Sequence, residues 1–137
     1  MIADYQNLFS NDQAVTTDVI SENVIDLGND DSVLQALNQK GMIEVYCIVT
    51  TAFTSAGAMN VTVTLQSDDD VAFGSATALQ SQTVAKATAI AGYKFRFSNL
   101  PVINEQYVAL LYTVSAIATA GKIWAGLVLD PQTAGLN

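Results

Sequence analysis

The chain of 137 residues carries 13 acidic and five basic residues, a net charge of −8, which excludes the basic face that a nucleic-acid-binding protein needs to neutralise phosphates. Half of the residues are hydrophobic and only 13% are charged, so the composition is that of one folded domain with a core and excludes a disordered protein. No apolar run approaches the ~20 residues that span a bilayer, and MIADYQNLFS at the start lacks the basic and apolar regions of a signal peptide, so we expect no membrane partner and no secretion.

In chain order, segments rich in Val, Ile, Thr, Tyr and Phe alternate with turn residues, which predicts strands. Apolar and polar residues alternate with a period of two, as from Val61 to Leu65 and from Tyr93 to Phe97. Strands with one buried and one wetted face are typical of antiparallel sheets packed as a sandwich. The predicted fold class is all-β, an antiparallel β-sandwich, specifically a jelly roll of about eight strands. We expect strong strands at 22–28, 42–53, 58–68, 88–100, 105–116 and 121–130, and weaker ones at 13–17 and 76–85.

Two kinds of connecting segment are recognisable between these strands. DDSVLQALNQKG predicts one short helix near 32–40, capped by Asp31 or Ser32 and ended by Gly41. Three connections, TSAG, TAIAG and IATAG, end in Ala-Gly at Gly57, Gly92 and Gly121, where glycine supplies the positive φ of a turn. We expect a single domain over 1–137, with an N-terminal arm at 1–12 and a C-terminal tail at 131–137.

Three consecutive aspartates, Asp68–Asp70, are the most suggestive candidate for a metal site, because hard cations bind several oxygen ligands. An EF-hand loop that begins at Asp68 needs Gly and Glu at its sixth and twelfth positions, where the sequence has Phe73 and Leu79. Neighbouring side chains of a strand point to opposite faces, and those of a turn splay into water. We therefore interpret the aspartates as a solvated turn, with a cation site as the alternative, and predict no metal ligand and no cofactor.

Catalytic groups are scarce, and the protein is predicted not to be an enzyme. The absence of histidine excludes Ser-His-Asp and Cys-His arrangements. Cys47 lies in the apolar run IEVYCIVTT and is expected to be a buried thiol, and a single cysteine fits folding in a reducing cytoplasm. Two acidic residues that converge in space would still allow glycoside hydrolysis, so a small glycan-acting enzyme stays open. Glu44, the one acidic residue within an apolar strand, is expected to face solvent.

Two outer-face features have both a binding and a structural interpretation. Because side chains alternate along a strand, Trp124 is expected on the face opposite that of Ile123 and Ala125. There it would stack on a sugar or anchor a protein interface, unless both faces of its strand are buried. Lys94 and Arg96 share a face and would meet an acidic partner, unless they are only the wet side of a strand.

Several segments, in a fixed order over residues 8–130, resemble one family: LFSNDQAVT, NVIDLG, VTTAFTSAGAMNVTVTLQSDDDVAF, AGYKFRFSNLP, YVALLYTVS and TAGKIWAGLVLD. The family is that of the small jelly-roll cement, or decoration, proteins on the heads of tailed bacteriophages. The resemblance implies a non-enzymatic virion protein, assembled in the host cytoplasm, that forms a homodimer on the outer surface of the capsid. There it would bind the major capsid protein and stabilise the head by bridging capsomers. The segment DDSVLQALNQKGM is longer and more helical than the family leads us to expect.

The resemblance supplies no catalytic residues, and the candidate contacts come from the chain ends and apolar side chains. Tyr5, Leu8 and Phe9 are expected to form an arm that docks on a neighbour, with packing on their own sandwich as the alternative, and Phe53 is expected at a loop tip. The full candidate interface is Tyr5, Leu8, Phe9, Phe53, Lys94, Arg96 and Trp124. The rival hypothesis is a carbohydrate-binding, lectin-like jelly roll with Trp124 and Asp68–Asp70 in its site.

Overall fold

The computed structural model describes residues 8–27, 43–97, 103 and 105–129. Within those ranges the regular secondary structure is entirely strand, and no helix there is long and apolar enough to cross a membrane. The predicted helix near 32–40, Tyr5 and the C-terminal tail lie outside the described residues. The strands are β1 (Leu8–Ala14), β2 (Val19–Ile20), β3 (Ile25–Asp26), β4 (Ile43–Thr54), β5 (Asn60–Asp68), β6 (Thr77–Ala85), β7 (Lys94–Phe97), β8 (Tyr107–Val114) and β9 (Ala120–Leu129).

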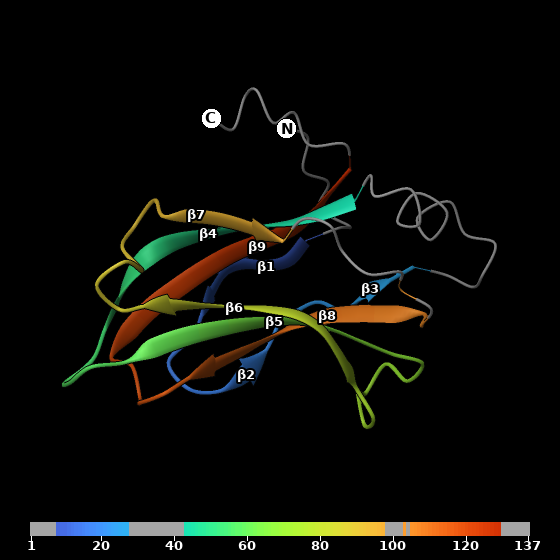
Figure 1. Ribbon diagram of the computed structural model, residues 1–137, viewed down its shortest axis with the longest axis horizontal. Coiled ribbons are helices and arrows are strands. Elements are labelled where there is room, and N and C mark those ends of the chain that lie inside the picture. Colours follow the sequence, from blue (N-terminus) through green and yellow to red (C-terminus); the bar gives the residue numbers. More distant parts are fainter. Residues whose placement is uncertain (1–7, 28–42, 98–102, 104, 130–137) are drawn as a thin grey trace.

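Two antiparallel sheets pack face to face, as Figure 1 shows. One sheet has the strand order β1-β9-β4-β7, and the other has the order β2-β8-β5-β6 with β3 also paired to β8. The pairings are nested: β5 with β6, β4 with β7, β2 and β3 with β8, and β1 with β9. A long hairpin wrapped around itself in this way is a jelly roll, and the predicted all-β sandwich is confirmed. Nine strands occur because β2 and β3 are two short strands that both pair with β8.

The core lies between the sheets and is formed by alternate residues of each strand, as the period of two in the sequence predicts. Branched aliphatic side chains suit this position because they pack well on a pleated surface. Phe9, Phe97 and Tyr112 are among the largest side chains that are fully enclosed. The same cluster takes in Val45, Cys47, Val49, Val61, Val63, Leu65, Ile123, Ala125 and Leu127.

A small polar network lies inside the sandwich where β1 bulges against β9. Ser10 Oγ donates to Gln13 Oε1 at 2.6 Å, so the Tyr112 hydroxyl, 2.7 Å from Ser10 Oγ, must donate to it. Burial raises the pKa of Tyr112 above its ordinary value and keeps the phenol neutral. The network ties β8 to β1 across the core, where the pairing of β1 with β9 is twice shifted in register.

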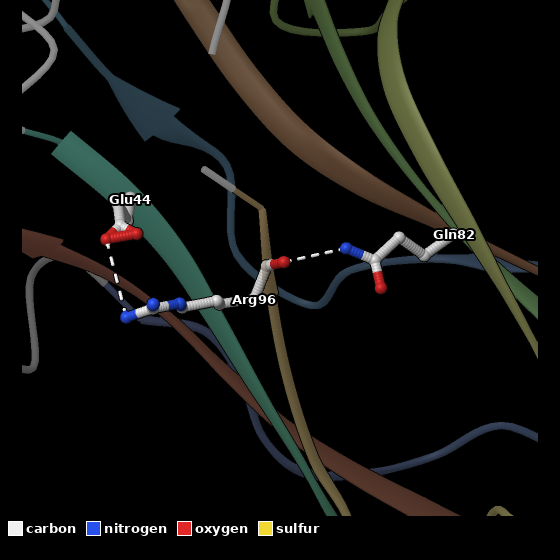
Figure 2. Close-up of polar contacts among 3 residues, drawn as sticks. All are labelled: Glu44, Gln82 and Arg96. Atoms are coloured by element: carbon white, nitrogen blue, oxygen red, sulfur yellow. Dashed lines mark hydrogen bonds and ion pairs between the residues drawn. The ribbon is translucent and has the colours of Figure 1, made fainter. Parts of the chain in front are cut away.

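The strand β6 spans nearly all of the weaker strand expected at 76–85. Two of its inward-facing residues, Gln80 and Gln82, are polar, so the alternation of apolar and polar residues is weak in this segment. The strand nevertheless pairs with β5 over nearly its whole length. Gln82 Nε2 donates to the backbone carbonyl of Arg96 at 2.6 Å, which closes the side of the sandwich between β6 and β7 (Figure 2). A glutamine at this inward position therefore joins the two sheets by a hydrogen bond.

Candidate protein-binding surface

The apolar residues predicted for an interface lie mainly inside the sandwich. Phe9 is fully buried in the core, which matches the alternative given for the N-terminal segment, and Leu8 is 7% exposed in β1. The expected arm at 1–12 therefore includes the first part of a sheet strand. The expectation that Phe53 lies at a loop tip is wrong: β4 runs on to Thr54, and Phe53 is 3% exposed within the core.

Trp124, Lys94 and Arg96 lie on the outer face of the four-stranded sheet. Register places Ile48 of β4 between Lys94 of β7 and Trp124 of β9, and the indole is half-buried. The Arg96 side chain extends away from β6 toward β4, where Nη1 lies 3.8 Å from Glu44 Oε1 (Figure 2). Glu44 is only 12% exposed at its side chain, so the expectation that it faces solvent is wrong. The arginine meets an acid of its own chain.

The three consecutive aspartates build a turn. Asp68 is buried at the end of β5, where its Oδ2 accepts the Ser75 N–H at 2.8 Å and its Oδ1 accepts the Asp70 N–H at 3.1 Å. Asp70 Oδ1 in turn accepts the Ala72 N–H at 3.0 Å. The Ser75 N–H bond above all holds the pKa of Asp68 below its ordinary value. The described residues contain no group of three or more acidic or thiol side chains placed to hold a metal ion.

The structure does not bring Trp124 and the aspartates together. Trp124 is on β9 of the four-stranded sheet and Asp68 ends β5 of the five-stranded sheet. Cys47 is fully buried in the core, where burial raises the pKa of its thiol above the ordinary value. The thiol is thus kept protonated and out of contact with solvent.

The most distinctive surface of the described part is one end of the sandwich, which we call the loop end. It consists of the connections β1–β2 (15–18), β4–β5 (55–59), β6–β7 (86–93) and β8–β9 (115–119), all on the left of Figure 1. Backbone hydrogen bonds cross between these connections, from Ala118 N to Thr16 O at 2.9 Å and from Lys86 N to Met59 O at 3.0 Å. The end of β4 joins these two pairs of connections, because Thr54 O accepts the Thr119 N–H at 2.7 Å and Phe53 N donates to Ala89 O at 3.0 Å, so the four segments form one hydrogen-bonded platform.

The loop end is almost without free charge. Its two ionisable charged residues are Asp18 and Lys86. Asp18 Oδ1 accepts the Val114 N–H at 2.9 Å, and Lys86 Nζ donates to the carbonyl of Gly57 at 2.6 Å. Both charges are thus used to hold loop backbone in place, in a chain whose net charge is −8.

Two isoleucines stand out from this platform. Ile90 is 57% exposed and Ile117 is 75% exposed, among neighbours that are mostly Ala, Ser, Thr and Gly. An open groove of about 470 Å³ lies beside Ile117, between the β1–β2 and β8–β9 connections. Its lining residues are Thr17, Asp18, Val114, Ser115, Ala116 and Ile117. Exposed apolar side chains on a hydrogen-bonded platform with few charges are the features of a protein-binding surface.

All three predicted Ala-Gly connections lie at the loop end, but their glycines differ. Gly92 and Gly121 have φ values of 91° and 151°, as the sequence predicts, whereas Gly57 is not among the positive-φ residues. At Gly121 an added Cβ would lie 2.3 Å from Phe53 Cδ1. This glycine lets the start of β9 approach the Phe53 ring and so fixes the end of the sandwich.

Sequence reasoning missed Ile90 and Ile117 because each lies in a short small-residue connection without charge or catalytic chemistry. The signal that was present is the Ala-Gly recurrence, since all three connections link an odd-numbered to an even-numbered expected strand and so must share one end. A family model for Bbp16 matches residues 9–127. The chain belongs to the Bbp16 family. That name suggests a bacteriophage protein, and no curated protein matches the sequence. The Bbp16 match includes every connection of the loop end.

Proposed function

We propose that this Bbp16-family protein is a capsid cement protein that binds the outer surface of a phage head and stabilises it by bridging capsomers. Its partners are the major capsid protein and a second copy of the chain, and its place is the outside of the virion after assembly in the host cytoplasm. The proposal draws on the resemblance of the sequence to jelly-roll cement proteins and on the phage association of the family name.

The observation that carries the proposal is the loop end. Ile90 and Ile117 are exposed on connections that are each hydrogen-bonded to another connection of the loop end, so little conformational entropy is lost when a partner binds. Only two charged residues, Asp18 and Lys86, lie on these connections, and each is hydrogen-bonded to backbone, so docking at the loop end desolvates few charges. Such a surface suits a static interface with another protein.

The stabilising effect follows from linkage. A protein that binds only the assembled shell lowers the free energy of that state by RT ln(1 + [L]/Kd), about 2.7 kcal/mol per site at a free concentration of 100 Kd. Repeated over the many equivalent sites of a head, this term raises the temperature at which the shell comes apart. No catalytic step is needed.

The test is co-sedimentation with expanded heads that lack the protein, with unexpanded heads beside them. The variants are Ile117→Asp and Ile90→Asp, and the matched control is Val71→Asp, since Val71 is 58% exposed at the opposite end. We expect saturable pelleting of the wild type and of Val71→Asp, with affinity reduced ~10-fold or more for each isoleucine variant because a charge enters an apolar contact.

Two results would contradict the proposal. Absence of pelleting with either form of head would reject cement function, and equal loss in Val71→Asp and Ile117→Asp would reject the loop end as the docking surface. The carbohydrate-binding alternative is tested in the same preparation: a rise in melting temperature with a glycan array pool or with calcium would favour it, and Trp124→Ala should then remove the rise.

A further inference from the structure

The positive charges of the chain differ in whether its own residues neutralise them. The chain has five basic residues, of which Lys40 lies outside the described ones. Lys86 Nζ donates to a loop carbonyl at 2.6 Å, and Arg96 Nη1 lies 3.8 Å from a carboxylate of β4. Within the described ranges, the side chains of Lys94 and Lys122 have no hydrogen bond and no ion pair. Both unpaired cations lie on the outer face of the four-stranded sheet.

These two lysines flank Trp124. Register places Lys94 of β7 opposite Ile48 of β4, and Ile48 opposite Trp124 of β9. Because neighbouring strands lie about 4.8 Å apart, the backbones at Lys94 and Trp124 are roughly 10 Å apart across the sheet. Lys122 lies two residues before Trp124, about 7 Å along β9, and on the same face because Ile123 between them is in the core. A half-buried apolar row, Ile48 and Trp124, thus has an exposed ammonium group on each of two sides.

We propose that this surface binds an acidic segment of another protein, with an apolar side chain of that segment on Ile48 and Trp124 and its carboxylates beside Lys94 and Lys122. We call the surface the Trp124 face, defined by these four residues. It is separate from the loop end, so the inference goes beyond the proposed function and does not depend on it. An apolar centre with a polar rim is the usual arrangement of a protein interface, and tryptophan is enriched among the residues that contribute most to binding.

Charge complementarity selects the occupant. The chain has a net charge of −8, so an acidic partner is repelled over most of its surface. Charges more than about 8 Å away are screened at physiological ionic strength, so Lys94 and Lys122 dominate for a segment that lies directly on the face. Glu44, an acid of the same sheet face, is paired with Arg96. A basic segment would meet like charges there, and a neutral one would desolvate two ammonium groups without compensation.

Ile48 favours a peptide over an acidic polysaccharide. Lysine side chains only donate hydrogen bonds, and either class of ligand would offer them carboxylates. Ile48 lies between Lys94 and Trp124 in the register, however, and a ligand that spans the two covers it. Sugar hydroxyl groups buried against this side chain would lose their hydrogen bonds to water without gaining others. A peptide supplies a carboxylate and an apolar side chain within a few residues.

The first test uses the whole chain and two short peptides. One peptide has a single leucine between runs of glutamate, and the other has the same leucine between runs of lysine. Trp124 is the only tryptophan of the chain, so its fluorescence reports contact at the face itself. We expect the acidic peptide to change the emission saturably, with affinity that falls as salt is raised from about 0.05 to about 0.5 M. The lysine peptide should have no effect.

Matched variants locate the binding. Lys94→Gln and Lys122→Gln each remove one positive charge, and the control Ser81→Glu lowers the net charge equally at an exposed position of β6 in the other sheet. We expect affinity for the acidic peptide to fall about 2- to 5-fold in each lysine variant, as for an exposed ion pair, and to be unchanged in Ser81→Glu. Asp12→Asn removes an exposed acid in the β1 bulge beside Trp124 and should raise the affinity. Asparagine tolerates the positive φ of Asp12.

Other outcomes would overturn the proposal. Unchanged Trp124 emission with the acidic peptide, or an equal loss of affinity in Ser81→Glu, would reject the Trp124 face as the site. Binding of polyuronate oligosaccharides while the acidic peptide stays inert would assign the face to glycans. Self-association that Lys94→Gln abolishes, measured by sedimentation velocity, would make the acidic residues of a second copy the occupant. None of these measurements uses phage heads, so their result is independent of cement function.

Discussion

Replacing Gly121 by alanine tests the packing that fixes the loop end. Gly121 is the second residue of β9 and has a φ of 151°. A Cβ added there would lie 2.3, 2.5 and 2.8 Å from Cδ1, Cε1 and Cγ of Phe53. Phe53 is 3% exposed in the core, so the ring cannot swing into solvent. The substitution therefore combines an unfavourable backbone angle with overpacking.

Two other glycines separate these effects. Gly92 has φ at 91° with nothing within 4 Å of an added Cβ, so Gly92→Ala carries the backbone cost alone, about 1–2 kcal/mol. Gly57 has open space and no positive φ, so Gly57→Ala should stabilise by about 0.4–1 kcal/mol through the unfolded chain. Overpacking adds about 1–3 kcal/mol, which gives about 2–5 kcal/mol for Gly121→Ala, a large part of the about 5–15 kcal/mol typical of a domain.

Urea unfolding followed by the fluorescence of Trp124, the single tryptophan, measures all three variants. From most to least stable, the expected order is Gly57→Ala, wild type, Gly92→Ala and Gly121→Ala. The slope of the unfolding free energy against urea concentration should be the same for all four proteins. In a double-mutant cycle, Phe53→Leu should reduce the cost of Gly121→Ala by about 0.5–3 kcal/mol because the clashing ring is gone. Equal costs for Gly121→Ala and Gly92→Ala, or no coupling to Phe53, would refute the steric argument.

Two further predictions concern ionisable groups. The pKa of Asp68 is below its ordinary value in the folded chain, so its carboxylate contributes stability above the ordinary pKa, about 4, and this contribution is lost as the pH falls through the lower folded pKa. Asp68→Asn should therefore destabilise the protein at about pH 7 but not at about pH 2, whereas the exposed Asp69→Asn should have little effect at either, as measured by urea unfolding. Cys47 is buried and its pKa is raised, so it should react with a thiol reagent at about pH 8 only as fast as the chain unfolds; rapid labelling of the native protein would contradict its placement.

Most of the fold was predictable because the period of two is strong where each strand buries one apolar face. The strands at 42–53, 58–68, 105–116 and 121–130 were predicted within a few residues of β4, β5, β8 and β9. The prediction over 88–100 began too early, since the strand that pairs with β4 starts at Lys94 and the residues before it form a connection of the loop end. Pairing partners, not local composition, decided where that strand begins.

The candidate site was less predictable because it depends on which segments meet in space. Phe53 comes shortly after two threonines and just before a run of small residues, so the sequence favours a loop tip. In the structure, the pairing of Thr54 with Ala120 extends β4 past Phe53. Ile90 and Ile117 carry no signal individually. Their common position follows only from the nested pairing, which places the β6–β7 and β8–β9 connections at the same end of the sandwich.

The distribution of charge gives the two ends of the sandwich different roles under the proposed function. Asp26 and Asp68 are both register partners of Tyr107, and Asp69 and Asp70 follow in the adjoining turn, so acidic residues gather at the end opposite the loop end. If the loop end docks on a shell, that acidic end projects into solvent. Copies on neighbouring sites then repel one another only weakly, because salt screens the charges between them.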